Sequence, residues 1–181
     1  MAPFGQAALA AHVIAQRVEM FFFMPAMSFG SGAGVLAGQN LGAGKPERAE
    51  KSAWGAVWLL EGFIGLVIVI LLLWVGPIVG IFTDDISLKA TSIQYIQIAM
   101  VGWTMIGFMF VMMNCLQGAG DTIAPMIIGV VDTWLITILP AYLLPKYTSW
   151  GVLGILWAIT ACVLFGGVAM IIYFRTGRWK N

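Results

Sequence analysis

The longest polar interruption in this chain is GQNLGAGKPERAE, at residues 38–50. It separates two apolar segments that are each long enough to cross a bilayer. Three glycines loosen the backbone at the end of the first segment, and Pro46 suits the first turn of a new helix. Glu47 and Glu50 favour the positive N-terminal end of that helix. The stretch therefore predicts a tight connection between two membrane helices.

The composition is typical of a polytopic membrane protein. Of the 181 residues, 61% are hydrophobic and only 9% are charged, whereas a soluble domain carries roughly 25% charged residues. A formal net charge of +1 gives no reason to expect a nucleic-acid partner. Cys115 and Cys162 both lie in apolar segments, which favours small packing residues over a disulfide or a metal pair.

Five apolar segments reach the length of about 20 residues that a bilayer core requires. They are expected at about 7–36, 53–82, 93–116, 123–144 and 151–174. Open sheets cannot sit in lipid, and the apolar runs show no strict alternation, so we expect helices. The predicted fold class is an all-α, polytopic transmembrane helix bundle that occupies residues 1–181 without a separate soluble domain. Within the first span, Gly30 and Gly34 stand four residues apart and predict a helix-packing face.

The basic residues are distributed unequally between the two sides of the predicted bundle. Cytoplasmic loops of membrane proteins carry an excess of Lys and Arg. Only Lys89 and Lys146 fall on one side, whereas the other side holds Lys45, Arg48, Lys51, Arg175, Arg178 and Lys180. We therefore expect the loop at 41–52 and the C-terminus to lie in the cytoplasm, in a chain embedded in the inner or plasma membrane.

Four charged residues fall within the predicted spans: Arg17, Glu19, Glu61 and Asp132. Each costs about 2.5–3.5 kcal/mol at a helix centre, so each should face a partner or a watery cavity. Glu19 is expected near the middle of the membrane, and Glu61 and Asp132 are expected nearer the cytoplasmic ends. Each carboxylate can bind a cation or substrate, or can act as a structural partner between helices, and the sequence leaves both interpretations open.

Two prolines lie within the spans near these carboxylates. Pro25 cannot donate to the carbonyl of Phe21, and Pro140 frees the carbonyl of Ile136. Because freed carbonyls in the membrane suit cation coordination, we expect a helix break near a binding site at each proline. The sequence contains no cysteine metal cluster and no hydrolase, metalloprotease or phosphate-loop motif. Neither an enzyme nor a metal site is expected.

Five motifs, in order, resemble the MATE (multidrug and toxic compound extrusion) transporters. They are ALAAH at 8–12, RVE at 17–19 with MP at 24–25, GQNLGAG at 38–44, QGAGDTIAP at 117–125 and GVLG at 151–154. Together they extend over nearly the whole chain. The resemblance implies two six-helix lobes and antiport of organic cations against Na⁺ or H⁺ by alternating access, with no cofactor. It places these five spans as the second to sixth helices of the C-terminal lobe.

The resemblance also implies a role for Glu19, because a carboxylate after Arg-Val matches an acidic position in some members. We expect Glu19, and secondarily Asp132 and Glu61, to bind the coupling ion or the organic cation. The expected partners are the lipid bilayer, small organic cations or drugs, and a missing N-terminal lobe if the chain is truncated. The alternative is a truncated or non-transporting membrane module with a structural role only.

Overall fold

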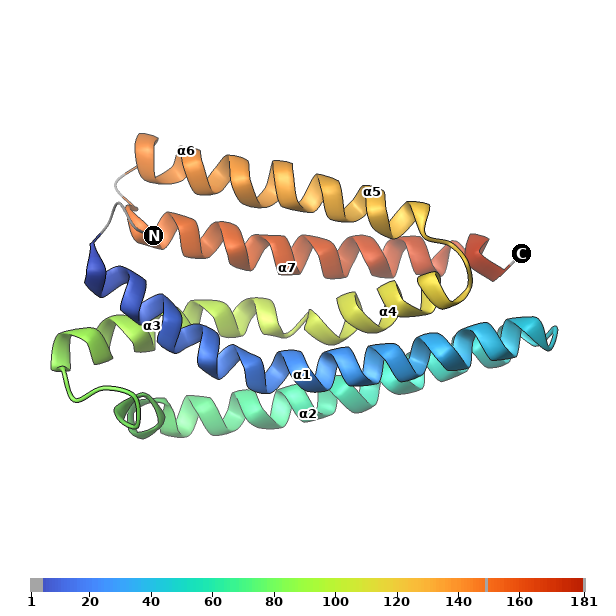
Figure 1. Cartoon of the computed structure of the whole chain (residues 1–181), viewed down its shortest axis with the longest axis horizontal. Helices are drawn as coiled ribbons and strands as arrows, with labels where there is room; N and C mark the ends of the chain where they lie inside the picture. Colours follow the sequence, from blue (N-terminus) through green and yellow to red (C-terminus); the bar gives the residue numbers. More distant parts are fainter. Residues whose placement is uncertain (1–4, 149, 181) are drawn as a thin grey trace.

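The computed structural model describes residues 5–148 and 150–180. Every regular element in these ranges is helical, which confirms the predicted all-α class. In chain order they are α1 (Gln6–Gly42), α2 (Pro46–Gly80), α3 (Ile86–Trp103), α4 (Ile106–Gly118), α5 (Ile123–Val131), the π-helix η2 (Asp132–Ile138), α6 (Leu139–Tyr147), α7 (Val152–Arg175) and the short 3-10 helix η3 (Arg178–Lys180). Figure 1 shows that they form a bundle of long helices with parallel or antiparallel axes.

Four helical stretches are long and apolar enough to span a membrane: α1, α2, the continuous stretch Ile123–Tyr147, and α7. The pair α3 and α4 gives a fifth span if it is counted as one span bent by 45°. α1 extends to Gly42, beyond the expected end near residue 36, and its 37 residues cover roughly 55 Å. Asn40 donates its side-chain amide to the carbonyl of Leu36 at 2.7 Å, so polar residues continue the helix past the apolar segment.

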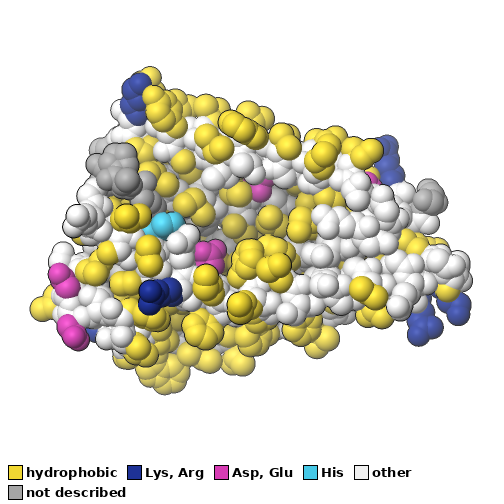
Figure 2. All heavy atoms as spheres, in the orientation of Figure 1, with side chains coloured by type: hydrophobic (Ala, Val, Ile, Leu, Met, Phe, Trp, Pro, Cys, Tyr) yellow, Lys and Arg dark blue, Asp and Glu magenta, His cyan; other side chains and the backbone are white. Residues whose placement is uncertain are grey.

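The ends of the helices fall into two groups, as Figure 1 shows. The connections α1–α2 and α4–α5 lie at the same end of the bundle as η3. The start of α1 and the connections α2–α3 and α6–α7 lie at the opposite end. On the face shown in Figure 2, hydrophobic side chains are spread over the surface between these ends, as expected for a surface in contact with lipid.

α1 lies at the centre of one half of the bundle and packs against α2, α3 and α4. Its small residues allow close approach to α4: a Cβ atom added to Gly34 would lie 2.6 Å from the carbonyl oxygen of Asn114. A Cβ atom on Gly38 would lie 2.7 Å from the carbonyl oxygen of Gly118. The predicted packing face is thus confirmed, and α4 is the helix that occupies it. α7 packs between the α3–α4 pair and the α5–α6 stretch.

The expected helix break at Pro25 is wrong, because α1 continues through that residue. One proline removes a single backbone hydrogen bond, and the packed neighbours of a membrane helix can hold such a helix together. Pro140 follows the π-helix η2, so the irregularity near it is a change of hydrogen-bonding pattern within a continuous span. A further kink occurs at Trp74, where the backbone leaves helical geometry three residues before Pro77.

The interruption between α3 and α4 occurs without a proline. Thr104 donates its hydroxyl to the carbonyl of Val101 at 2.8 Å, and so competes with the backbone for that acceptor. Met105 then adopts φ −117° and ψ 0°, outside helical geometry. The third span is consequently a broken one, with its interruption inside the bundle.

Candidate functional site

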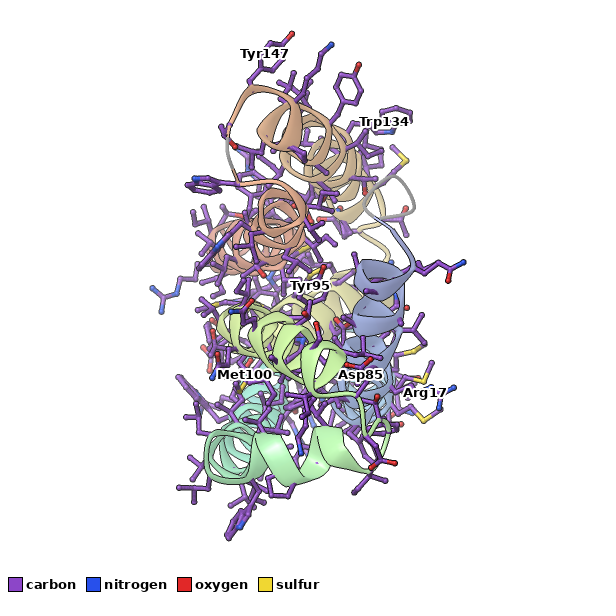
Figure 3. The ribbon with its side chains drawn as sticks, turned by 90° about the vertical axis from the view of Figure 1, so that its left-hand side faces the viewer. Arg17, Asp85, Tyr95, Met100, Trp134 and Tyr147 are labelled. Carbon is purple, nitrogen blue, oxygen red and sulfur yellow. The ribbon has the colours of Figure 1, made fainter. Side chains whose placement is uncertain are left out.

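A small pocket lies between α1, α3 and α7. Its volume is about 40 Å³, and its polar or aromatic lining residues are His12, Gln16, Glu19, Tyr95, Trp103 and Thr160. Figure 3 shows Tyr95 on α3 between the ribbons of α1 and α7. A space of this size accommodates water molecules or a small ion, and is far below the 300–1,000 Å³ of a typical drug pocket.

Glu19 is the acidic residue of this pocket. It is half-buried, and the neighbouring Val18 is fully packed. Trp103 on α3 lines the same pocket as Glu19. Trp103 is only 2% exposed, and its ring lies 4.3 Å from the ring of Phe22 between centroids. One side of the Glu19 pocket is therefore formed by a buried aromatic residue that packs against a second aromatic ring.

Arg17 points away from Glu19, as expected for residues two positions apart on a helix. Figure 3 shows its side chain directed out of the bundle. Arg17 lines a separate apolar groove with residues of α1 and α2, and Pro25 lies in that groove as well. Pro25 is absent from the lining of the Glu19 pocket. The structure therefore does not bring Pro25 to the carboxylate that its freed carbonyl was expected to assist.

Asp132 occupies a different position, at the start of η2. Its side chain is 3% exposed, and the thiol of Cys162 on α7 donates to its Oδ2 atom at 3.1 Å. The Oδ1 atom has no hydrogen-bond partner within the part of the chain that the structure describes. Thr137 donates its hydroxyl to the backbone carbonyl of Asp132 at 3.1 Å. Gly166 leaves room for the carboxyl, because a Cβ atom there would lie 3.0 Å from Oδ2.

Glu61 occupies a third position, on α2. Its Oε1 atom accepts a hydrogen bond from the backbone N–H of Phe108 at 3.2 Å, in the first turn of α4. The three predicted carboxylates thus have three different sets of neighbours. Among residues 5–148 and 150–180, no group of three or more His, Cys, Asp or Glu side chains could hold a metal ion.

Sequence reasoning missed the residues that complete the Glu19 pocket from other helices. Tyr95, Trp103 and Thr160 come from α3 and α7, far from Glu19 along the chain. Thr160 also donates its hydroxyl to the carbonyl of Ile98 at 3.3 Å, which ties α7 to α3. A tyrosine and a threonine inside apolar spans were visible in the sequence, but only the packing shows that they face one carboxylate.

Comparison with known proteins gives a consistent result. The MatE family model matches residues 1–143. The probable multidrug resistance protein NorM of Thermotoga maritima is 27% identical over 98% of this chain and 38% of its own length. NorM of Burkholderia pseudomallei is 30% identical over 96% of this chain and 38% of its length. The chain thus spans about 38% of the length of these curated relatives.

Solved structures show the same fold. An outward-facing multidrug resistance MATE family transporter of the MOP superfamily superimposes with a TM-score of 0.80, at 21% identity, over 93% of this chain and 37% of that protein. An inward-facing structure of such a transporter gives a TM-score of 0.79 at 20% identity, over 95% of this chain and 41% of that protein. At these identities the likeness concerns the arrangement of helices.

Proposed function

Because this chain belongs to the MatE family, we propose that it forms part of a transporter that exports organic cations and drugs in exchange for Na⁺ or H⁺. The family consists of integral membrane transporters, in agreement with the expectation that the chain is not an enzyme. Its curated relatives are named multidrug resistance proteins. The chain spans about 38% of the length of these relatives. We therefore propose that it acts together with a companion lobe, which completes the substrate pathway.

The observation that supports this function best is the Glu19 pocket. A carboxylate inside a membrane bundle is costly unless it has a partner, and here it lines a small pocket between three spans that also contains the polar residues His12, Tyr95 and Thr160. The pocket volume of about 40 Å³ suits a proton, a water molecule or a small cation better than a drug. We therefore assign the coupling ion to Glu19, and place the organic cation in a larger cavity formed with the companion lobe.

Asp132 is the second candidate for the coupling ion. A fully buried carboxyl with one unpartnered oxygen is unfavourable as a bare anion, so a proton or cation bound there would stabilise the site. Its only side-chain donor among the described residues is the weak thiol of Cys162. Pro140 lies just after the π-helix that Asp132 begins, and such irregular turns are frequent at functional sites.

The decisive experiment compares Glu19→Gln with Arg17→Gln in the transporter as its natural gene encodes it. Both changes remove a charge from α1, but only Glu19 lines the pocket. Efflux activity is measured as ion-gradient-driven dye uptake into inverted membrane vesicles, in which the cytoplasmic face points outward. Protein amounts are matched by immunoblotting. We expect Glu19→Gln to abolish coupled efflux and Arg17→Gln to retain it. Normal efflux by Glu19→Gln would refute the assignment.

A second candidate is a membrane module with a structural role only, because a carboxylate within a span can also serve as a partner between helices, as Glu61 does for the first turn of α4. The purified chain reconstituted in liposomes separates the two. Ion-driven dye flux across these liposomes would favour a transport-competent chain. Dye flux that appears only when the companion lobe is added would show that the chain is one component of the transporter. If no flux is seen with or without that lobe, a purely structural role would be favoured.

A further inference from the structure

The interruption of the third span places the N-terminus of a helix, with backbone N–H groups that its own helix leaves unpaired, inside the bundle. α3 ends at Trp103 and α4 begins at Ile106, so the first turn of a new helix lies within a span bent by 45°. The N–H groups of a first helical turn have no partner inside their own helix. In the membrane, such groups need a partner from elsewhere in the protein. Met105, at the N-cap position of α4, provides no side-chain hydrogen bond.

Glu61 on α2 supplies this missing partner. Its Oε1 atom accepts from the backbone N–H of Phe108 at 3.2 Å, across 47 positions of sequence. A carboxylate at a helix N-terminus is favoured by the helix dipole as well as by the hydrogen bond. Glu61 therefore acts as an N-cap provided by a neighbouring helix, which explains how this carboxylate is accommodated in the span.

Gly107 makes this cap sterically possible. A Cβ atom at this position would lie 2.5 Å from the Oε1 atom of Glu61 and 3.0 Å from its carboxyl carbon. Any side chain there would push the carboxylate away from the first turn of α4. The glycine and the carboxylate thus form one arrangement, although they come from different helices.

The capped interruption is adjacent to the Glu19 pocket. Trp103 is the last residue of α3, and it lines that pocket together with Glu19. Gly102 lines the pocket too. A change in the bend between α3 and α4 would therefore move Trp103 relative to Glu19.

We propose that Glu61 is a positioning residue whose hydrogen bond to the first turn of α4 holds the bend of the third span and so fixes Trp103 against Glu19. This differs from a direct role in binding the transported cation, because the Oε1 atom of Glu61 already accepts a hydrogen bond from the backbone N–H of Phe108. The effect on the bend depends on the fold alone, and the effect on transport rests on the proposed role of Glu19.

The bend can be measured without transport. Spin labels are attached to cysteines that replace the exposed Gln97 on α3 and Gln117 on α4, with Cys115→Ala and Cys162→Ser in the background. Distances between the labels are recorded by pulsed electron paramagnetic resonance in lipid nanodiscs. Glu61→Gln keeps an acceptor oxygen, whereas Glu61→Leu removes it. We expect an unchanged distance distribution in the first variant and a shifted or broadened one in the second.

Two glycine variants test the same arrangement from the other side. Gly107→Ala should reproduce the shift seen with Glu61→Leu, whereas Gly62→Ala, next to Glu61 but in open space, should not. If Glu61→Leu does not fold, Gly107→Ala carries the test. An unchanged distribution in Gly107→Ala and Glu61→Leu would overturn the proposal. An equal shift in Glu61→Gln would also overturn it, because the negative charge and not the hydrogen bond would then be required.

Dye efflux by the complete transporter gives the second measurement. We expect Glu61→Gln to retain more efflux than Glu61→Leu, in the same order as the distance distributions. If the distance distributions shift but dye efflux is unchanged, Glu61 caps α4 as proposed, but the proposed effect of this cap on Glu19 is wrong. If Glu19→Gln transports normally while the bend still depends on Glu61, the proposed coupling residue fails and the cap remains.

Discussion

The thiol of Cys162 on α7 donates a hydrogen bond to the buried carboxyl of Asp132 at 3.1 Å, and so joins two adjacent spans. This contact is the only side-chain hydrogen bond that the Asp132 carboxyl receives in the described part of the chain. The sequence predicted that Cys162 is only a packing residue. In the structure it is also the hydrogen-bond donor to a candidate ion-binding carboxylate.

Cys162→Ala should therefore destabilise the chain more than Cys162→Ser, since serine keeps a hydroxyl donor. Leaving a buried acceptor without its donor costs about 1–3 kcal/mol. Thermal denaturation in detergent measures the difference, with the wild-type chain as reference. Equal stability of the alanine and serine variants would show that the thiol contributes no hydrogen bond to the fold.

The close contact between α1 and α4 predicts a contrast between glycines of one helix. Gly34→Ala should destabilise the chain by about 1–3 kcal/mol, because its new methyl group would meet the backbone of Asn114. Gly32→Ala, two residues earlier and facing open space, should be neutral or slightly stabilising, because alanine favours helix. Thermal denaturation of both variants in the same detergent checks the contrast, which a similar loss in the two would contradict.

The connection between α4 and α5 is held by a residue near the end of α7. The Tyr173 hydroxyl donates to the Asp121 carboxyl at 2.6 Å. Hydrogen bonds to charged groups contribute about 1.5–3 kcal/mol, so Tyr173→Phe should lower stability by up to that amount. It should also speed amide exchange at residues 119–122, as measured by hydrogen–deuterium exchange mass spectrometry. Exchange rates identical to those of the wild-type chain would exclude this tie.

Membrane sidedness can be tested with single cysteines. The α1–α2 connection and η3 lie at one end of the bundle, and the α2–α3 connection lies at the other. With the basic residues of the first end in the cytoplasm, Lys45→Cys and Arg178→Cys should resist a membrane-impermeant thiol reagent in intact cells. Asp84→Cys should react. Labelling of the first two from outside would reverse the proposed orientation.

Much of the fold follows from local properties of the sequence. Five apolar stretches predict the spans because length and hydropathy alone decide whether a helix can cross a bilayer. The small residues of α1 predict a packing face because only small side chains allow two backbones to approach. The motifs shared with a known family led to the same result as the family match over residues 1–143.

The interruption of the third span and the roles of the carboxylates were not predictable in this way. Pro25 was expected to break α1 and does not, whereas α3 and α4 separate near Thr104 without any proline. A proline removes one backbone hydrogen bond, but packing decides whether the helix continues.

The sequence by itself determined that this chain is a membrane-embedded helical bundle with three carboxylates inside its spans. Only the tertiary structure decided what each carboxylate contacts. Glu61 meets the first turn of α4, Asp132 meets Cys162, and Glu19 faces a pocket completed by α3 and α7. The physical reason is that hydropathy is a property of neighbouring residues, whereas the partners of a buried charge come from helices that are distant in sequence and meet only when the bundle packs.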